Sequence, residues 1–321
     1  MHDWRPAASR EQLAKRARLL AATREFFAQR AVLEVETPLL VNAGVTDVNL
    51  RPVTVRLGER DMFLHTSPEY AMKRLLAAGS GDIYQLCRVV RGDERSALHN
   101  PEFTLLEWYR LQMSMDALID EVALLLNALA VCLGRPTRPL LRKTYREAFV
   151  ESLGVDPLES TAEQLQRCAL RHGLDTQSAA ALGRDGILDF LIGAVIGPTL
   201  GRESWLALTH YPASQAALAQ LDAGDSRVAL RFEIYADGIE LANGFQELAD
   251  PVEQRRRFES DNALRAAQGL PAIPMDERLL AALASGMPAC SGVAVGFDRT
   301  VMVLCGARRI DDVIAFVSES A

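Results

Sequence analysis

Residues 292–299 contain the pattern that most limits how this chain can fold. Small residues alternate with larger ones there, and because successive side chains of a strand point to opposite faces, Gly292, Ala294 and Gly296 share one face. A strand face without large side chains lets a flat ligand lie against the backbone. An apolar run with helical character follows, so Arg299 is expected in the first helical turn, where its planar guanidinium could bind a phosphate. The pattern predicts a strand–helix unit that holds a nucleotide, and an ordinary tight strand–helix packing is the alternative.

A second pair of strands is predicted around a polar turn at residues 92–98. Ile83–Arg91 is expected to be the first strand, and the second begins after Pro101. Period-2 geometry places Phe103, Glu107 and Tyr109 on one face of the second strand. An aromatic ring, a carboxylate and a phenol on one face can form part of a pocket for an aromatic base and a cationic substrate. The alternative is a half-buried strand whose Glu107 reaches solvent.

Three glutamates follow one another at intervals of seven residues, at positions 233, 240 and 247. They span an expected hairpin of residues 231–235 and 239–248 with a turn at Ala236-Asp237-Gly238. Strict alternation places Glu240 on the face opposite Asn243, Phe245 and Glu247. If all four serve one site, the strand must contain a bulge, and we expect it at Asn243-Gly244. The alternative is an acidic strand pair that faces solvent.

Together these segments resemble the signature motifs of class II aminoacyl-tRNA synthetases. A helix over Glu11–Arg30 followed by Val32–Pro38 resembles motif 1, Ile83–Tyr109 resembles motif 2, and Gly292–Leu304 resembles motif 3. The run Gly238–Leu248 and the corner Thr66-Ser67-Pro68-Glu69 resemble the lysine-binding signatures of the lysyl type. The resemblance implies an α+β fold: one class II catalytic domain over residues 1–321, with a six- or seven-stranded antiparallel sheet flanked by helices. It also implies a homodimer formed through motif 1, and we expect a helical insertion at about residues 144–201.

The resemblance assigns functional residues in four groups. Arg91 and Arg299 are the expected catalytic residues, which neutralise charge on the phosphates. The implied ATP-binding residues are Arg91, Asp93, His99, Asn100, Phe103, Glu240, Leu241, Gly296 and Arg299. The implied substrate-binding residues are Ser67, Pro68, Glu69, Glu107, Tyr109, Asn243, Phe245, Glu247 and Ala294. Glu233 and Glu240 are the expected ligands of Mg²⁺ on ATP, because Mg²⁺ typically takes only one or two protein carboxylates.

Two features depart from common patterns of the family. Motif 2 usually has Arg-Asn-Glu where this chain has Arg91-Gly92-Asp93. Ala97 stands where many relatives have a basic residue, and Arg95 could replace that positive charge.

In the Thr-Ser-Pro-Glu corner, Ser67 is expected to be a helix N-cap, with Pro68 at the first helical position.

The substrate and acceptor are predicted from what is missing. The helix of motif 1 starts near Ser9, so we expect no anticodon-binding domain, and the net charge of −7 with a pI near 5.4 gives no basic surface for stable nucleic-acid binding. A truncated lysyl-type core resembles the elongation factor P–(R)-β-lysine ligases. That family uses ATP to activate β-lysine and modifies a lysine side chain of elongation factor P, a translation factor. Ala294 points the same way, because lysyl-tRNA synthetases have glycine there.

Two other functional classes stay open at this point. One is a minimal enzyme that charges tRNA or a small molecule with lysine. The other is a silent binding module, against which the retained charged residues argue. The five cysteines form no C-x-x-C pair, so zinc and disulfides are not indicated, and no signal peptide is evident, which suits the cytoplasm. The apolar stretch 187–200 is too short and too interrupted to cross a membrane.

Overall fold

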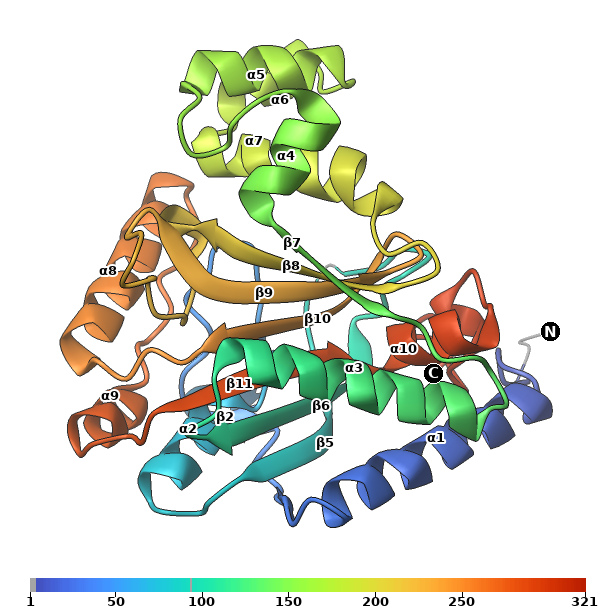
Figure 1. Ribbon diagram of the computed structural model, residues 1–321. Coiled ribbons are helices and arrows are strands. Elements are labelled where there is room, and N and C mark those ends of the chain that lie inside the picture. Colours follow the sequence, from blue (N-terminus) through green and yellow to red (C-terminus); the bar gives the residue numbers. More distant parts are fainter. Residues whose placement is uncertain (1–3, 93) are drawn as a thin grey trace. The chain divides into compact units, whose positions relative to one another are not determined.

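The computed structural model describes residues 4–92 and 94–321, which divide into two compact units (Figure 1). The first unit comprises residues 1–114, 124–137 and 247–321, and the second comprises residues 115–123 and 138–246. Helix α3 (Met115–Cys132) is shared between them, with its division after Ala123. Each unit is described by itself.

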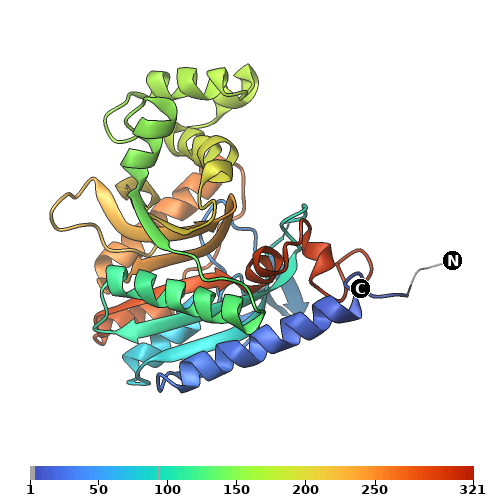
Figure 2. The same cartoon turned by 45° about the vertical axis from the view of Figure 1, so that its right-hand side comes forward.

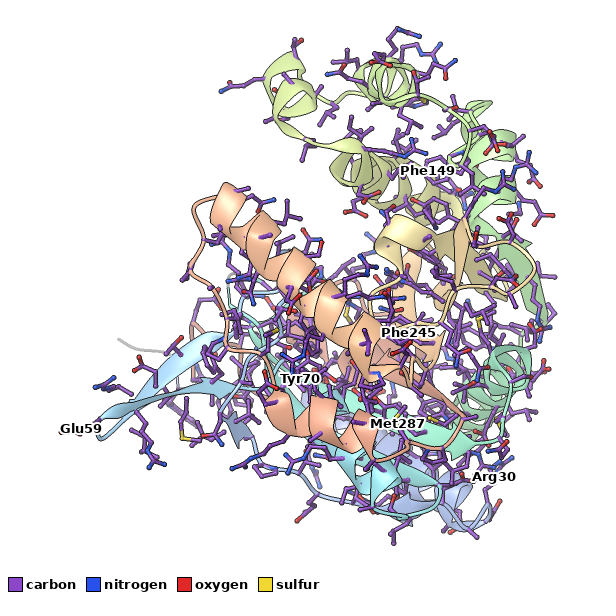
Figure 3. All side chains as sticks on the ribbon, turned by 90° about the vertical axis from the view of Figure 1, so that its left-hand side faces the viewer. Arg30, Glu59, Tyr70, Phe149, Phe245 and Met287 are labelled. Carbon is purple, nitrogen blue, oxygen red and sulfur yellow. The ribbon has the colours of Figure 1, made fainter. Side chains whose placement is uncertain are left out.

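The first unit is built on four strands in the order β1-β5-β6-β11. Figures 1 and 2 show β5, β6 and β11 side by side. The β1–β5 pair is parallel, and the β5–β6 and β6–β11 pairs are antiparallel. The strands are β1 (Leu33–Glu34), β5 (Ile83–Val90), β6 (Glu102–Leu111) and β11 (Cys290–Gly296). A smaller sheet in the order β2-β4-β3 consists of β2 (Leu40–Val41), β3 (Val53–Leu57) and β4 (Arg60–Leu64), with Glu59 at the exposed tip of the β3–β4 hairpin (Figure 3).

The helices of the first unit fix the strands that carry the candidate site. They are α1 (Arg10–Ala28), α2 (Glu69–Ala77), α8 (Pro251–Ala267), α9 (Glu277–Ala284), α10 (Phe297–Cys305) and the short 3₁₀ helix η4 (Ile310–Asp312). Ser9 caps α1 by accepting a hydrogen bond from the Gln12 amide. Helix α2 packs against α9, and α10 packs against β6. In the buried part of this unit, Phe27 of α1 stacks on Tyr84 of β5 with ring centroids 4.3 Å apart.

The second unit holds four strands in the order β10-β9-β8-β7. They are β7 (Leu140–Thr144), β8 (Trp205–Pro212), β9 (Val228–Ala236) and β10 (Ile239–Gln246). The β7–β8 pair is parallel and the other two pairs are antiparallel. Asp237 and Gly238 form the two-residue turn between β9 and β10, and both have positive φ, as a tight hairpin turn of this kind requires.

Between β7 and β8 the chain is helical. This stretch contains α4 (Tyr145–Leu153), α5 (Ala162–Arg171), α6 (Thr176–Ala181), α7 (Arg184–Phe190), the π-helical turn η1 (Leu191–Ile196) and the 3₁₀ turn η2 (Gly197–Thr199); η3 (Ala213–Gln215) follows β8. Thr144 and Thr161 each begin a helix with a reciprocal capping box. The buried Phe149 of α4 anchors the apolar core beneath these helices (Figure 3).

The expected α+β class with mainly antiparallel pairing is confirmed, and several predicted elements are present within about two residues of their expected ends. The expected number of six or seven strands is wrong: residues 4–92 and 94–321 contain eight in these two sets. Strands β1 and β7 are two and five residues long, too short to reveal a period-2 pattern. Within the described residues no helix is long and apolar enough to cross a membrane.

Candidate active site

Strands β6 and β11 form the floor of the candidate site. Their register places Ala294 opposite Glu107 and Gly292 opposite Tyr109, so the two faces predicted separately from the sequence are one face. Gly292 is required here because a Cβ atom at this position would overlap the ring of Tyr109 and the carboxylate of Glu247. The small residues of β11 therefore make room for the side chains beside them.

Glu107 is a buried carboxylate held by two hydroxyl groups. It is 2% exposed, and it accepts hydrogen bonds from Ser67 Oγ (2.7 Å) and Tyr109 Oη (2.7 Å). Burial raises the pKa of Glu107 to about 8, and the charge of Glu69 adds to the effect. A carboxyl in this state favours the arrival of a cation, because a positive charge nearby would let it ionise.

Glu247 and Glu69 are bridged by a lysine that the sequence analysis did not single out. Lys73 Nζ lies 2.7 Å from Glu69 Oε1 and 2.6 Å from Glu247 Oε2, and the lysine and Glu247 are each 1% exposed. Burial raises the pKa of Glu247 to about 7 despite the opposing charge of Lys73. Burial alone would lower the pKa of Lys73, but Glu247 and Glu69 outweigh it and raise that pKa, so the lysine is charged. We call Glu69, Glu107, Glu247 and Lys73 the carboxylate cluster.

The corner before α2 differs by one residue from the prediction. Helix α2 begins at Glu69, so Pro68 rather than Ser67 is the N-cap residue. The Ser67 hydroxyl nevertheless accepts a hydrogen bond from the Glu69 amide at 3.0 Å, while its own proton goes to Glu107. Ser67 therefore joins the helix start to the carboxylate cluster.

Arg91, Phe103, His99 and Arg299 form a second group in the first unit. The guanidinium carbon of Arg91 lies 5.1 Å from the centroid of the Phe103 ring. Arg299 and Ser96 contact the two ring nitrogens of His99. Burial and the neighbouring charges of Arg299 and Arg91 lower the pKa of His99 to about 4, so this imidazole is neutral at physiological pH. The guanidinium of Arg91 beside the Phe103 ring, and that of Arg299 against His99, suit a nucleotide with its phosphates.

The loop after Arg91 is tied to the C-terminal segment. Arg95 pairs with Asp311 (3.0 Å) and Glu319 (2.5 Å), and the Ile310 amide donates to the Ala97 carbonyl. Arg95 is therefore committed to acidic partners, which argues against the expectation that it replaces the charge missing from the loop. Asn100 accepts from the Ser318 amide and donates to the Glu102 carbonyl. The predicted ATP residue Asp93 lies outside the described residues.

In the second unit, a bulge brings the acidic residues of the hairpin to one face. The register of β9 and β10 shifts between Glu240 and Ala242, so the extra residue is Leu241 and not Asn243-Gly244 as expected. Before the shift Glu240 pairs with Tyr235, and after it Asn243 pairs with Glu233. Paired residues share a face, so Glu233, Tyr235, Glu240 and Asn243 all point to the same side.

Glu233 is already engaged within this group. It is 6% exposed, and its two oxygens accept from Arg231 (2.6 Å) and from Tyr235 Oη (2.8 Å). Arg231 in turn lies 4.4 Å from the centroid of the Tyr211 ring. A metal ion would have to compete with the half-buried guanidinium of Arg231 for Glu233, so this residue fits the predicted role of a metal ligand poorly. Among the residues that the structure describes, no group of three or more His, Cys, Asp or Glu side chains is arranged to hold a metal.

The predicted site residues fall into two sets. Within the first unit the structure brings together Ser67, Glu69, Glu107, Tyr109, Glu247 and Ala294, and it groups Arg91, His99, Phe103 and Arg299, with Gly296 immediately before α10. Glu233, Glu240, Leu241, Asn243 and Phe245 belong to the second unit. The i, i+4 spacing of Glu69 and Lys73 was a signal for the missed lysine, although that spacing usually marks a surface ion pair.

Comparison with known proteins gives a consistent result. Residues 1–320 match the family model of class II tRNA synthetases (D, K and N). The chain is 47% identical over 326 residues to a protein of Avibacterium paragallinarum named elongation factor P–(R)-β-lysine ligase, with 100% of this chain and 99% of the relative covered. It is 48% identical over 324 residues to the protein of the same name from Salmonella typhi, with 99% of this chain and 98% of the relative covered.

Proposed function

The chain belongs to the family of class II tRNA synthetases of the D, K and N type, and we propose that it is an ATP-dependent ligase that joins (R)-β-lysine to a lysine side chain of elongation factor P. Relatives named elongation factor P–(R)-β-lysine ligase match this chain over nearly their whole length. The structural observation that carries the proposal is the carboxylate cluster beside the face of β11 that holds only the small residues Gly292, Ala294 and Gly296. Glu69, Glu107 and Glu247 suit a substrate with two amino groups, because nearby ammonium groups would favour the ionised form of these carboxyls.

The reaction consists of two displacements. A carboxylate oxygen of β-lysine attacks the α-phosphorus of ATP, pyrophosphate leaves, and an aminoacyl-adenylate forms. The neutral ε-amine of the acceptor lysine then attacks the carbonyl carbon, AMP leaves with the bonding electron pair, and the amine loses a proton as the amide forms. No covalent bond to the enzyme is needed, so the protein contributes positioning and electrostatic stabilisation.

We assign the nucleotide to the second group of the first unit. Arg91 and Arg299 offer charge to the phosphates, and Phe103 offers a ring on which adenine can stack. Neutral His99 lies against Arg299 and adds no charge of its own. Asn100 shapes the loop through its contacts with Ser318 and Glu102 and is a positioning residue in this scheme.

Magnesium supplies charge neutralisation on the phosphates when it is bound. Glu240 is the residue that we propose to hold it, together with phosphate oxygens. Glu233 was predicted to share this role, but its contacts with Arg231 and Tyr235 point to a structural part in orienting the hairpin.

We further propose a single catalytic domain with a helical insertion at about residues 144–201, acting in the cytoplasm as a homodimer. The side chains of Leu33 and Leu39, in and beside the segment that resembles motif 1, are 55% and 40% exposed. Two exposed leucines close together in sequence suit a surface that is covered by a second copy.

The test is the intact mass of elongation factor P after incubation with the enzyme, Mg-ATP and (R)-β-lysine, with lysine-accepting tRNA in a parallel reaction. We expect the protein to gain the mass of one lysyl unit and the tRNA to remain uncharged. A charged tRNA with unmodified protein would identify a minimal synthetase. Absence of amino-acid-dependent pyrophosphate exchange with any amino acid would identify a silent module.

A further inference from the structure

Lys73 bridges Glu69 and Glu247 within the carboxylate cluster and has no role in the reaction proposed above. Its helix is fixed in place, because Met72 and Leu76 on either side of it belong to a buried apolar cluster that also includes residues of α8 and α9. The ammonium group therefore sits at a determined position, in contact with Glu69 from its own helix and Glu247 from the segment after β10.

Stability alone does not explain a lysine at this position. A buried ion pair contributes little or nothing beyond what a well-packed apolar residue of similar volume would contribute. Lysine is also rare in the chain: of 35 basic residues only Lys15, Lys73 and Lys143 are lysines. Lys15 makes the same i, i+4 pair, 2.6 Å from Glu11, but its side chain is 33% exposed, against 1% for Lys73.

The charges of the cluster have a definite sum. The ionisable groups that face one another are Lys73 and Glu69 from α2, Glu107 and Tyr109 from β6, Glu247, Cys87 from β5 and Cys290 from β11. Burial raises the pKa values of the phenol and of both thiols, so all three are neutral. With its carboxylates ionised the cluster carries three negative charges and one positive charge. The remaining charge of −2 matches the two ammonium groups of a diamine.

We propose that Lys73 is a positioning residue for substrate selection: it holds Glu69 and Glu247 in place and sets the charge of the cluster to that of two ammonium groups. This inference rests on the proposed function, because it assumes that β-lysine binds at the cluster. Without Lys73 the repulsion between Glu69 and Glu247 would be unrelieved, and a proton would take its place on one of them. The cluster would then attract a dication less strongly.

Calorimetric titration of (R)-β-lysine into the intact enzyme, in two buffers of different ionisation enthalpy, tests this inference. At about pH 7 the wild type should release between about one and two protons on binding, because the dication ionises Glu107, which is mostly protonated at this pH, and Glu247, which is about half protonated. Lys73→Met should release more, since without the lysine Glu247 is fully protonated beforehand, and it should bind at least roughly tenfold more weakly. The loss of affinity in Lys73→Met should become smaller towards about pH 9, where the carboxyl groups ionise even without the lysine.

Lys15→Met is the matched control and should change neither the affinity for (R)-β-lysine nor the number of protons released. The Kd of ATP should stay within about twofold in both variants. If Lys73→Met does not fold, Lys73→Gln removes the charge while keeping a hydrogen-bond donor. Unchanged affinity and proton release in either variant would overturn the role of Lys73 and leave the proposed function standing. A wild type that does not bind (R)-β-lysine would instead refute the proposed function.

One further measurement needs only the wild type. If the carboxylate cluster carries a net charge of −2, (R)-β-lysine should bind at least roughly tenfold more tightly than 6-aminohexanoate, which has only one ammonium group. Equal affinities would contradict the inference whether or not the Lys73 variants fold.

Discussion

Gly292 lies directly opposite Tyr109 in the β6–β11 ladder, and the tyrosine ring covers the place that a side chain at position 292 would occupy. The same missing side chain makes room for the carboxylate of Glu247. One backbone position thus determines where a phenol and a carboxylate of the cluster can lie.

Gly292→Ala should therefore damage the site directly. The added methyl group must displace Tyr109 or Glu247, and overpacking of this kind typically destabilises a fold by about 1–3 kcal/mol. We expect lysine-dependent pyrophosphate exchange to fall by roughly a hundredfold, because a misplacement of about 1 Å can have that effect. Gly193→Ala is the control, since a Cβ atom there meets no other atom within 4 Å. Equal exchange rates for the two variants would contradict this account of the floor.

The raised pKa of Glu107 links stability to pH. Because the folded-state pKa, about 8, is above the ordinary value of 4.5, the fold favours the neutral acid. The resulting stabilisation is present at low pH and is lost as the pH rises through about 8. Glu107→Gln mimics the neutral acid, so its melting temperature should exceed that of the wild type at about pH 9 and approach it at about pH 5.

The same variant should bind (R)-β-lysine more weakly, because an amide oxygen can accept a hydrogen bond from an ammonium group but carries no negative charge to balance it. Melting curves across this pH range and a ligand titration check both halves of the prediction. If the melting temperatures of the wild type and of Glu107→Gln changed in parallel with pH, Glu107 would be ionised in the folded protein without a substrate.

Much of the first unit could be predicted because its strands follow simple rules. The small residues of β11 and the alternation in β6 placed Gly292, Ala294, Glu107 and Tyr109 on faces that the structure joins. Arg299 is in the first turn of α10 as the pattern indicated. These features depend on a period of two or on a helix start, and both can be read locally.

What the sequence did not reveal depends on contacts between distant segments. The pairing of Arg95 with Asp311 joins residues 216 positions apart. Lys73 resembles a surface lysine until the burial of α2 is known. The bulge was expected at a glycine, the usual cue, but the register shifts at Leu241, whose side chain is buried, and only the pairing with β9 reveals it.

Ala294 offers a test of substrate selection. Its methyl group is half-buried on the floor, opposite Glu107, where lysyl-tRNA synthetases have glycine. Ala294→Gly should raise the use of α-lysine relative to β-lysine, by the roughly 10–200-fold range that one methyl group can give. The ratio of kcat/KM values in pyrophosphate exchange measures this effect. A ratio that stays flat would show that the methyl group does not select the substrate.

Glu233 and Glu240 share one face of the β9–β10 hairpin, yet we predict opposite effects from neutralising them. Glu233→Gln takes the carboxylate away from the half-buried Arg231, and the cost should stay below the roughly 3–5 kcal/mol that is typical of breaking a fully buried ion pair. The melting temperature should fall while the Mg²⁺ concentration for half-maximal exchange stays constant. Glu240→Gln should raise the Mg²⁺ requirement, because a phosphate-bound metal loses a carboxylate. If Glu233→Gln raised the Mg²⁺ requirement as much as Glu240→Gln, the contacts of Glu233 with Arg231 and Tyr235 would have to yield to the metal, and both glutamates would be its ligands.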